Sequence, residues 1–170
     1  MRRIRYAVAS SLDGYIAGPN GEFDWIIADP EIDATDLFEP FDTLLIGSRT
    51  FELMVRMGQS EVPGKKLFVF SHSLRQQDYP HVTMVTGDPS DLANTLRQQD
   101  GKDIWLFGGG VLFHSFLEAG LVDTVEVSII PVLLGGGLPL LPPPGRRTTL
   151  KLTAHKIYKS GIVSLEYAVA

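Results

Sequence analysis

Residues 104–110 read Ile-Trp-Leu-Phe-Gly-Gly-Gly, and a helical pattern follows over residues 111–119. Four consecutive apolar residues predict a strand that is covered on both faces, as strands of parallel sheets are. The glycines permit a sharp turn into the helix, in which Phe113 and Phe116 share one face and after which Gly120 stops the pattern. A buried strand that leads directly into an amphipathic helix is typical of an α/β domain.

Short apolar runs and helical patterns also alternate in the rest of the first two thirds of the chain. Further strands are predicted at residues 4–8, 43–46, 66–70 and 82–86. Helices are expected between them, at residues 33–38, 49–57 and 88–101. Asp88 followed by Pro89 is a typical helix start, because the Asp side chain caps the first turn and proline fits its first position.

The last third of the chain has a different pattern. Residues 125–130 alternate, a loop rich in glycine and proline follows over 131–145, and two more alternating runs cover 150–158 and 162–169. Lys-Ser-Gly at 159–161 lies between these two runs and predicts a hairpin. The sequence therefore predicts one α/β domain over residues 1–170, with a mixed sheet of about eight strands, flanking helices and an antiparallel C-terminal hairpin.

Composition excludes several classes of function. The net charge of −5 supplies no overall basic field for nonspecific nucleic-acid binding. Without cysteine, the chain has no disulfide, no cysteine-based zinc site and no cysteine nucleophile. The four histidines are too scattered for a zinc pair at helical spacing, and no metal site is expected. No apolar stretch approaches membrane length, so a cytoplasmic protein is expected.

Three strand-to-helix junctions carry groups that suit an anionic ligand. Gly108, Gly109 and Gly110 precede a helix, whose free N–H groups and positive dipole end favour phosphate. Ser48 and Arg49 follow the strand near residue 46, and Ser71 and His72 follow the strand at 66–70. Each junction alone has a plain interpretation: a tight turn for the glycines, or a helix capped by Ser48 with a solvated arginine. Standard P-loop and Rossmann glycine patterns are absent.

The segment from Ala9 to Gly18 leaves the first strand and turns at Asp13-Gly14. One interpretation is a local turn in which Asp13 bonds the neighbouring backbone. The other is a loop that closes over a ligand, with Trp25 as an apolar wall.

Five short motifs occur in the order seen in the dihydrofolate-reductase-like superfamily. They are Ser-Leu-Asp-Gly-Tyr-Ile-Ala at 11–17, Gly-Ser-Arg-Thr-Phe at 47–51, Phe-Ser-His-Ser at 70–73, Leu-Phe-Gly-Gly-Gly at 106–110 and Ile-Pro-Val-Leu-Leu-Gly-Gly-Gly at 130–137. The resemblance covers nearly the whole chain. The sequence is most similar to the branch that contains the reductase domain of riboflavin biosynthesis and its stand-alone relatives.

The resemblance implies a three-layer α/β sandwich and a reductase that takes hydride from NADPH at the carboxyl ends of the strands. Position by position, it assigns the pyrophosphate to Gly108, Gly109, Gly110 and Val111; the adenosine phosphates to Gly47, Ser48, Arg49 and Thr50; the 2′-phosphate to Ser71 and His72; and the nicotinamide to Val8, Ala9, Ile16 and Ala17. Relatives often carry arginine directly after the glycine of the second motif, whereas Ser48 stands there in this chain. The preference for NADPH over NADH therefore stays open.

For the substrate, the resemblance suggests a small heterocycle such as a pterin or a ribosylaminopyrimidine. Dihydrofolate reductases bind the pterin with an acid on the first helix, which makes Asp36 the first candidate here, with Asp13 and Trp25 as further ones. A dinucleotide- or pterin-binding protein without turnover is the alternative of another class, and a purely structural module is a third. The alternating C-terminal strands also predict a homodimer.

Overall fold

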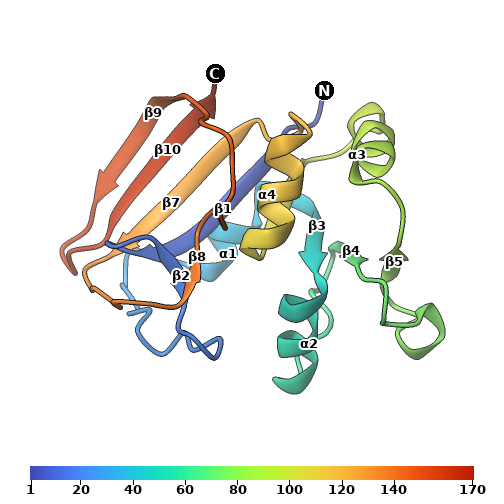
Figure 1. The fold of residues 1–170 in the computed structure, drawn as a ribbon, viewed down its shortest axis with the longest axis horizontal. Helices are drawn as coiled ribbons and strands as arrows, with labels where there is room; N and C mark the ends of the chain where they lie inside the picture. Colours follow the sequence, from blue (N-terminus) through green and yellow to red (C-terminus); the bar gives the residue numbers. More distant parts are fainter.

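The computed structural model describes residues 1–170 and contains a central sheet with helices on both of its faces (Figure 1). The sheet strands are β1 (Ile4–Ser11), β3 (Phe41–Gly47), β4 (Lys66–Phe70), β5 (Thr83–Val85), β6 (Asp103–Gly108), β7 (Thr124–Ile130), β9 (Leu150–Ile157) and β10 (Val163–Val169). The helices are α1 (Ala34–Phe38), α2 (Ser48–Arg56), α3 (Pro89–Gln98) and α4 (Gly110–Glu118), with a short 3₁₀ helix η1 (Gln76–Asp78). Two short strands, β2 (Tyr15–Ala17) and β8 (Leu138–Pro139), form a separate small sheet.

The eight strands of the main sheet lie in the order β5-β4-β3-β6-β1-β7-β10-β9. All neighbouring pairs from β5 to β7 are parallel, and β10 pairs antiparallel with both β7 and β9. The predicted mixed sheet of about eight strands and its antiparallel C-terminal hairpin are therefore confirmed. The hairpin turns where Lys-Ser-Gly predicted it, and Gly161 takes a φ of +93°, which favours glycine.

Strand alternation divides the core between the two faces of the sheet. In β3, Leu45 joins a cluster with Tyr6 and Phe116 beneath α3 and α4. Its neighbours Leu44 and Ile46 point to the other face and pack there with residues of α1 and α2. All three β3 side chains are fully buried, which explains why this strand reads as a continuous apolar run. The layers are thus helices, sheet and helices.

Aspartate side chains cap α1 and α3, whereas α2 and α4 begin after glycines that make no side-chain cap. Asp88 accepts a hydrogen bond from the Ser90 N–H at 2.7 Å, and Asp33 accepts one from the Thr35 N–H at 2.7 Å. Ser48, the expected cap of α2, is instead its first helical residue, and Gly47 holds the cap position without any side-chain hydrogen bond. A glycine has no side chain with which to cap, so the first N–H groups of α2 are left for solvent or a ligand.

The sheet of β2 and β8 was not predicted, because two strands of three and two residues carry no measurable alternation. Tyr15 pairs with Pro139 and Ala17 with Leu138, so the turn after β1 is tied to the loop after β7. In Figure 1 this pair lies at the carboxyl end of β1, beside the lower end of α4.

The β9 edge of the sheet is unusually open. All eight residues of β9 are exposed, and those of β10 are half-buried. The exposed side chains include Leu152 and Ile157, at 48% and 72% of their full accessible surface. None of the helices has the length and apolar character needed to cross a membrane.

Candidate functional site

The predicted phosphate-binding turns meet at the carboxyl ends of adjacent strands. In the pairing of β3 with β6, Ile46 lies opposite Gly108, and Gly47 lies opposite Phe70 of β4. A Cβ atom on Gly47 would stand 3.2 Å from the carbonyl oxygen of Gly108, so the two turns approach closely at this point. The Arg49 turn and the triple-glycine turn therefore lie on the same side of the molecule.

Thr50 lies between the two turns. A Cβ atom on either Gly108 or Gly109 would be 3.6 Å from the Thr50 hydroxyl oxygen. Gly108 has a φ of +151°, and Gly109 caps α4 without any side-chain hydrogen bond. The first N–H groups of α4 consequently face a small, backbone-lined space with a hydroxyl at its side.

Gly110 has a different structural reason to be glycine. It is buried, and a Cβ atom there would lie 2.7 Å from the carbonyl oxygen of Pro139. Its missing side chain allows the β8 segment to pack against α4. Val111, the next residue, is 70% exposed.

The charged and hydroxyl groups predicted beside these turns are distributed along α2 and the end of β4. Arg49 is exposed and makes no hydrogen bond or ion pair within the chain. Ser71 is buried, and its hydroxyl oxygen accepts from the N–H groups of Ser73 at 3.2 Å and Leu74 at 3.0 Å. That hydroxyl shapes the turn, whereas the exposed His72 side chain is available to a ligand.

The four residues assigned to the nicotinamide lie around the end of β1. Val8 and Ala9 belong to β1 and line a large cavity, while Ile16 and Ala17 belong to β2 and are half-buried. Strands β4, β3, β6 and β1 are consecutive neighbours. Because neighbouring strands are about 4.8 Å apart, their ends span about 14 Å, a distance that suits an extended dinucleotide.

Asp13 ties the turn after β1 to the glycine loop after β7. Its carboxylate accepts hydrogen bonds from the Ser11 hydroxyl at 2.6 Å and from the N–H groups of Leu134 and Gly135 at 3.1 and 2.8 Å. These bonds, the Ser11 hydroxyl first, lower the pKa of Asp13 from 3.8 to about 2. Asp13 therefore bonds its own turn, as in the local-turn interpretation, and it also bonds the backbone of the loop after β7.

We expect the Asp13 clamp to weaken only in acid. A carboxylate whose pKa is lowered by folding stabilises the folded state above its unfolded pKa, and this contribution disappears as pH falls through about 4 toward 2. Asp13→Asn should therefore have a lower melting temperature than the parent by a constant margin above pH 5, and this margin should shrink below pH 4. Thermal unfolding across pH tests this, with Asp24→Asn as the control, since Asp24 is exposed and unbonded. A margin that does not change with pH would contradict it.

A cavity of about 480 Å³ lies on the sheet face covered by α1 and the segment before it. Its floor comes from residues of β1, β7, β10 and β9, and its apolar cover includes Ile26, Ile27, Ile32 and Leu37. Trp105 of β6 closes one side and donates its indole N–H to the Ala7 carbonyl at 3.0 Å. Because Val8 and Ala9 line it, the cavity adjoins the predicted nicotinamide position.

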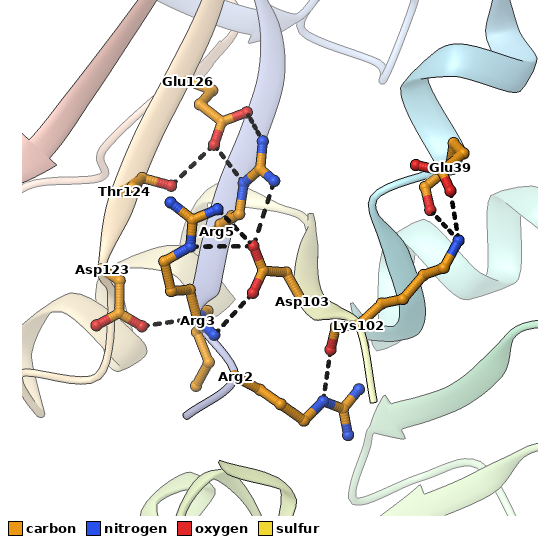
Figure 2. A network of polar contacts seen from close by, with 10 residues as sticks. Arg2, Arg3, Arg5, Glu39, Lys102, Asp103, Asp123, Thr124 and Glu126 are labelled. Atoms are coloured by element: carbon orange, nitrogen blue, oxygen red, sulfur yellow. Dashed lines mark hydrogen bonds and ion pairs between the residues drawn. The ribbon is translucent and has the colours of Figure 1, made fainter. Parts of the chain in front are cut away.

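One acid on the cavity floor is neutralised by arginine (Figure 2). Glu126 accepts from both Nε and Nη2 of Arg5, at 2.7 and 2.9 Å, and from the Thr124 hydroxyl at 2.8 Å. The Glu126 carboxylate in turn raises the pKa of Arg5. Arg5 also reaches Asp103 at 3.3 Å, so it is held from two sides.

Other polar groups of the floor come from β10 and from the covering segment. Glu166 lies directly opposite Glu126 in the pairing of β10 with β7, and its carboxylate has no hydrogen bond or ion pair within the chain. Next to this pair, the Ser128 and Ser164 hydroxyls bond each other at 2.9 Å. Asp29 is buried, and hydrogen bonds from Ser160 and the Glu31 N–H lower its pKa.

Asp36 and Trp25 are not among the residues that line this cavity. Asp36 is exposed in the first turn of α1, although its neighbour Leu37 is part of the lining. Trp25 is half-buried and donates its indole N–H to the Glu22 carbonyl at 2.9 Å. Asp13 also lies outside the lining, in the clamp described above. The three side chains are therefore not brought together at one point.

Sequence reasoning missed the acids of the cavity floor. The runs Glu-Val-Ser at 126–128 and Ser-Leu-Glu at 164–166 place polar side chains at alternate positions, which is the signal that they share one sheet face. Their meeting depends on the antiparallel register of β10 with β7, which no local pattern reveals. No group of three or more His, Asp or Glu side chains is placed to hold a metal ion.

The architecture is that of a dihydrofolate-reductase-like α/β domain with a candidate ligand site at the carboxyl ends of its parallel strands. The family model of the RibD C-terminal domain matches residues 2–164, and the chain belongs to that family. The resemblance inferred from the five motifs is confirmed.

Relatives and solved structures are similar to this chain over nearly its whole length. The uncharacterized protein YyaP of Bacillus subtilis strain 168 is 36% identical over 98% of this chain and 94% of its own. A structure from Shewanella sp. PV-4, provisionally named for riboflavin biosynthesis, has a TM-score of 0.85 and 26% identity, over 100% of this chain and 99% of its own. The deaminase and uracil reductase of Thermotoga maritima shares the fold, with a TM-score of 0.72 and 19% identity, over 99% of this chain and 57% of its own.

Proposed function

We propose that this chain is a single-domain NADPH-dependent reductase of a small heterocyclic substrate such as a pterin or a ribosylaminopyrimidine. The main support is that Gly47, Thr50, Gly108 and Gly109 converge in one backbone-lined space. The cavity that Val8 and Ala9 line lies next to this space. Membership in the riboflavin-type reductase family supports an oxidoreductase of this kind. We expect the protein to work in the cytoplasm.

The residues present fit the dinucleotide. Its pyrophosphate would lie against the N-terminus of α4 at Gly108, Gly109, Gly110 and Val111, and its adenosine phosphates against Gly47, Ser48, Arg49 and Thr50, with Ser71 and His72 beyond them. Bound NADPH would supply hydride to an electrophilic carbon of the substrate. The chain's own part is to align the two rings at the end of the cavity that Val8 and Ala9 line, and to exclude water with its apolar cover.

We expect Arg49 to distinguish the two nicotinamide cofactors. Its guanidinium is exposed, unpaired and two residues beyond Gly47, where it can form a bidentate pair with a 2′-phosphate. A charged hydrogen bond contributes about 1.5–3 kcal/mol, so Arg49→Ala should weaken NADPH binding about 10- to 100-fold and NADH binding much less. Titration of each cofactor against protein fluorescence measures this.

Arg56 provides the matched control for this measurement. It lies in the last turn of the same helix, is exposed and has no partner within the chain. Arg56→Ala removes the same charge and should leave both affinities nearly unchanged. Equal losses of NADPH and NADH affinity in Arg49→Ala would remove its role at the 2′-phosphate.

The alternative function is a dinucleotide- or pterin-binding protein without turnover. It is favoured by the placement of the candidate acids, since neither Asp36 nor Asp13 lines the cavity. NADPH oxidation, followed with a panel of pterins and aminopyrimidines, distinguishes the two functions. Binding without oxidation by any member of the panel would favour the alternative, and absence of both NADPH binding and pterin binding would contradict both functions.

We also propose that two copies associate through the open β9–β10 end of the sheet. Leu152 and Ile157 are exposed on an unpaired edge strand, an arrangement that isolated proteins usually avoid. Light scattering at micromolar concentration should give twice the 18.7 kDa chain mass. Leu152→Lys should shift that mass toward the monomer, and a monomer mass for the parent protein would refute the dimer.

A further inference from the structure

The charge of the cavity floor restricts what the cavity can accept. Three carboxylates line it, those of Asp29, Glu126 and Glu166, against a single ammonium group, that of Lys156. Lys156 is already paired, since its Nζ lies 3.7 Å from the Glu31 carboxylate and 4.6 Å from the Tyr158 ring centroid. The only arginine near the floor, Arg5, is bound to Glu126 and Asp103. The other basic side chain of the lining is the exposed His155 imidazole, so no free lysine or arginine faces into the cavity.

The two glutamates of the floor differ in how they are compensated. Glu126 and Glu166 are directly opposite each other across β7 and β10, and like charges in that relation repel. Both oxygens of Glu126 are occupied by Arg5. Glu166 has neither cation nor hydrogen-bond donor within the chain, and it is half-buried beside the apolar Leu165 and Ile162, which share the lining. A carboxylate in this position gains from any ligand that brings N–H donors.

The remaining lining indicates the rest of the ligand. Apart from Asp29, the cover is aliphatic, the Trp105 indole closes one side, and the floor offers small side chains at Ala7, Ala9 and Ala154. Such a slot suits a flat aromatic ring that enters from the end at Val8 and Ala9. Two adjacent N–H groups on that ring, as in an amidine-type ring edge, match the two oxygens of a carboxylate.

We propose that the cavity binds an unphosphorylated heterocycle through a ring edge with two adjacent N–H donors, and that Glu166 accepts both hydrogen bonds. A phosphorylated substrate is disfavoured, because its charge would approach the three carboxylates of the lining with no free lysine or arginine to meet it. The inference depends on the proposed function in treating the cavity as the place of the reducible ring. It narrows that function by excluding the phosphoribosyl substrate class.

The test uses two probes that differ in their donors. In 2,4-diamino-6,7-dimethylpteridine, an amino group lies beside a ring nitrogen that can carry a proton, whereas 6,7-dimethyllumazine has carbonyl groups in place of both amino groups and so offers no amino group beside a ring N–H. We expect calorimetric titration of the full chain to show at least tenfold tighter binding of the diamino compound. Uridine 5′-monophosphate should not compete with it. Equal affinity for the two pteridines, or displacement by the nucleotide, would overturn the proposal.

Substitutions test whether the Glu166 side chain causes the preference for the diamino compound over the lumazine. Glu166→Gln places an amide N–H₂ where an acceptor is required and should reduce the affinity for the diamino compound about 10- to 100-fold, with little change for the lumazine. Glu52→Gln is the control, because Glu52 is half-buried, unpaired and outside the cavity. A Glu166→Gln protein that keeps the preference refutes the assignment, and the ranking of the two probes by the parent decides the ligand class even if that variant does not fold.

A separate titration with NADPH keeps this result independent of the proposed function. NADPH binding without any preference for the diamino compound would remove only the inference about the cavity. Selective binding of the diamino compound without NADPH binding would remove the reductase and leave the assignment of the ligand class in place.

Discussion

Gly109→Val should abolish NADPH binding while the chain stays folded. The valine side chain would fill the space between the N-terminus of α4 and Thr50, where the pyrophosphate is proposed to lie. Each backbone N–H bond to a charged phosphate contributes about 1.5–3 kcal/mol, so the loss of two such bonds predicts at least about 100-fold weaker binding. Fluorescence titration with NADPH measures the loss.

The structure also explains why the fold should survive this change. Gly109 has a φ of −99°, which any residue adopts, and a Cβ atom there meets only the Thr50 hydroxyl at 3.6 Å, an ordinary contact. Gly87→Val is the matched control, because Gly87 lies in open space at a similar strand-to-helix junction, before α3. An NADPH affinity unchanged in Gly109→Val would refute the pyrophosphate position.

Most of the fold was predictable because its signals are local. The buried strands β3, β4 and β6 are continuous apolar runs, and the turn at 159–161 has the composition of a hairpin. Strand order was beyond such reasoning: β1 lies between β6 and β7, partners about 100 residues or more along the chain. The small sheet of β2 and β8 was missed for the same reason, since it exists only through pairing across the molecule.

In the candidate site, too, the features with local sequence signals could be predicted and those that depend on strand pairing could not. The glycine turns could be identified because they directly follow strands whose carboxyl ends must share one edge of a parallel sheet. The cavity acids could not, because Glu166 meets Glu126 only through the register of β10 with β7. Asp36 was chosen through the resemblance, as an acid on the first helix, but that helix directs Leu37 to the cavity and leaves Asp36 exposed. A helix of five residues has too weak a periodicity to predict its buried face.

Phe116→Ala should cause the largest loss of stability among the changes considered. Phe116 lies on the buried face of α4 and is fully buried, and its ring meets the Phe70 ring edge-on at a centroid distance of 5.6 Å. Truncation of a buried phenylalanine removes its contacts and leaves a cavity, which costs about 3–5 kcal/mol. For a chain of this size each kcal/mol lowers the melting temperature by about 2–4 °C, so urea and thermal unfolding both detect the change.

Phe116→Ala also tests whether the core packing of α4 can be weakened without loss of NADPH binding at the first turn of that helix. Val111→Ala, on the exposed side of the helix, is the control and should alter the free energy of unfolding by less than about 0.5 kcal/mol. Because Phe116 lies nearly two turns from Gly109, a protein that stays folded at low temperature should still bind NADPH there. A loss of less than about 1 kcal/mol in Phe116→Ala would mean that the core beneath α4 is looser than its burial indicates.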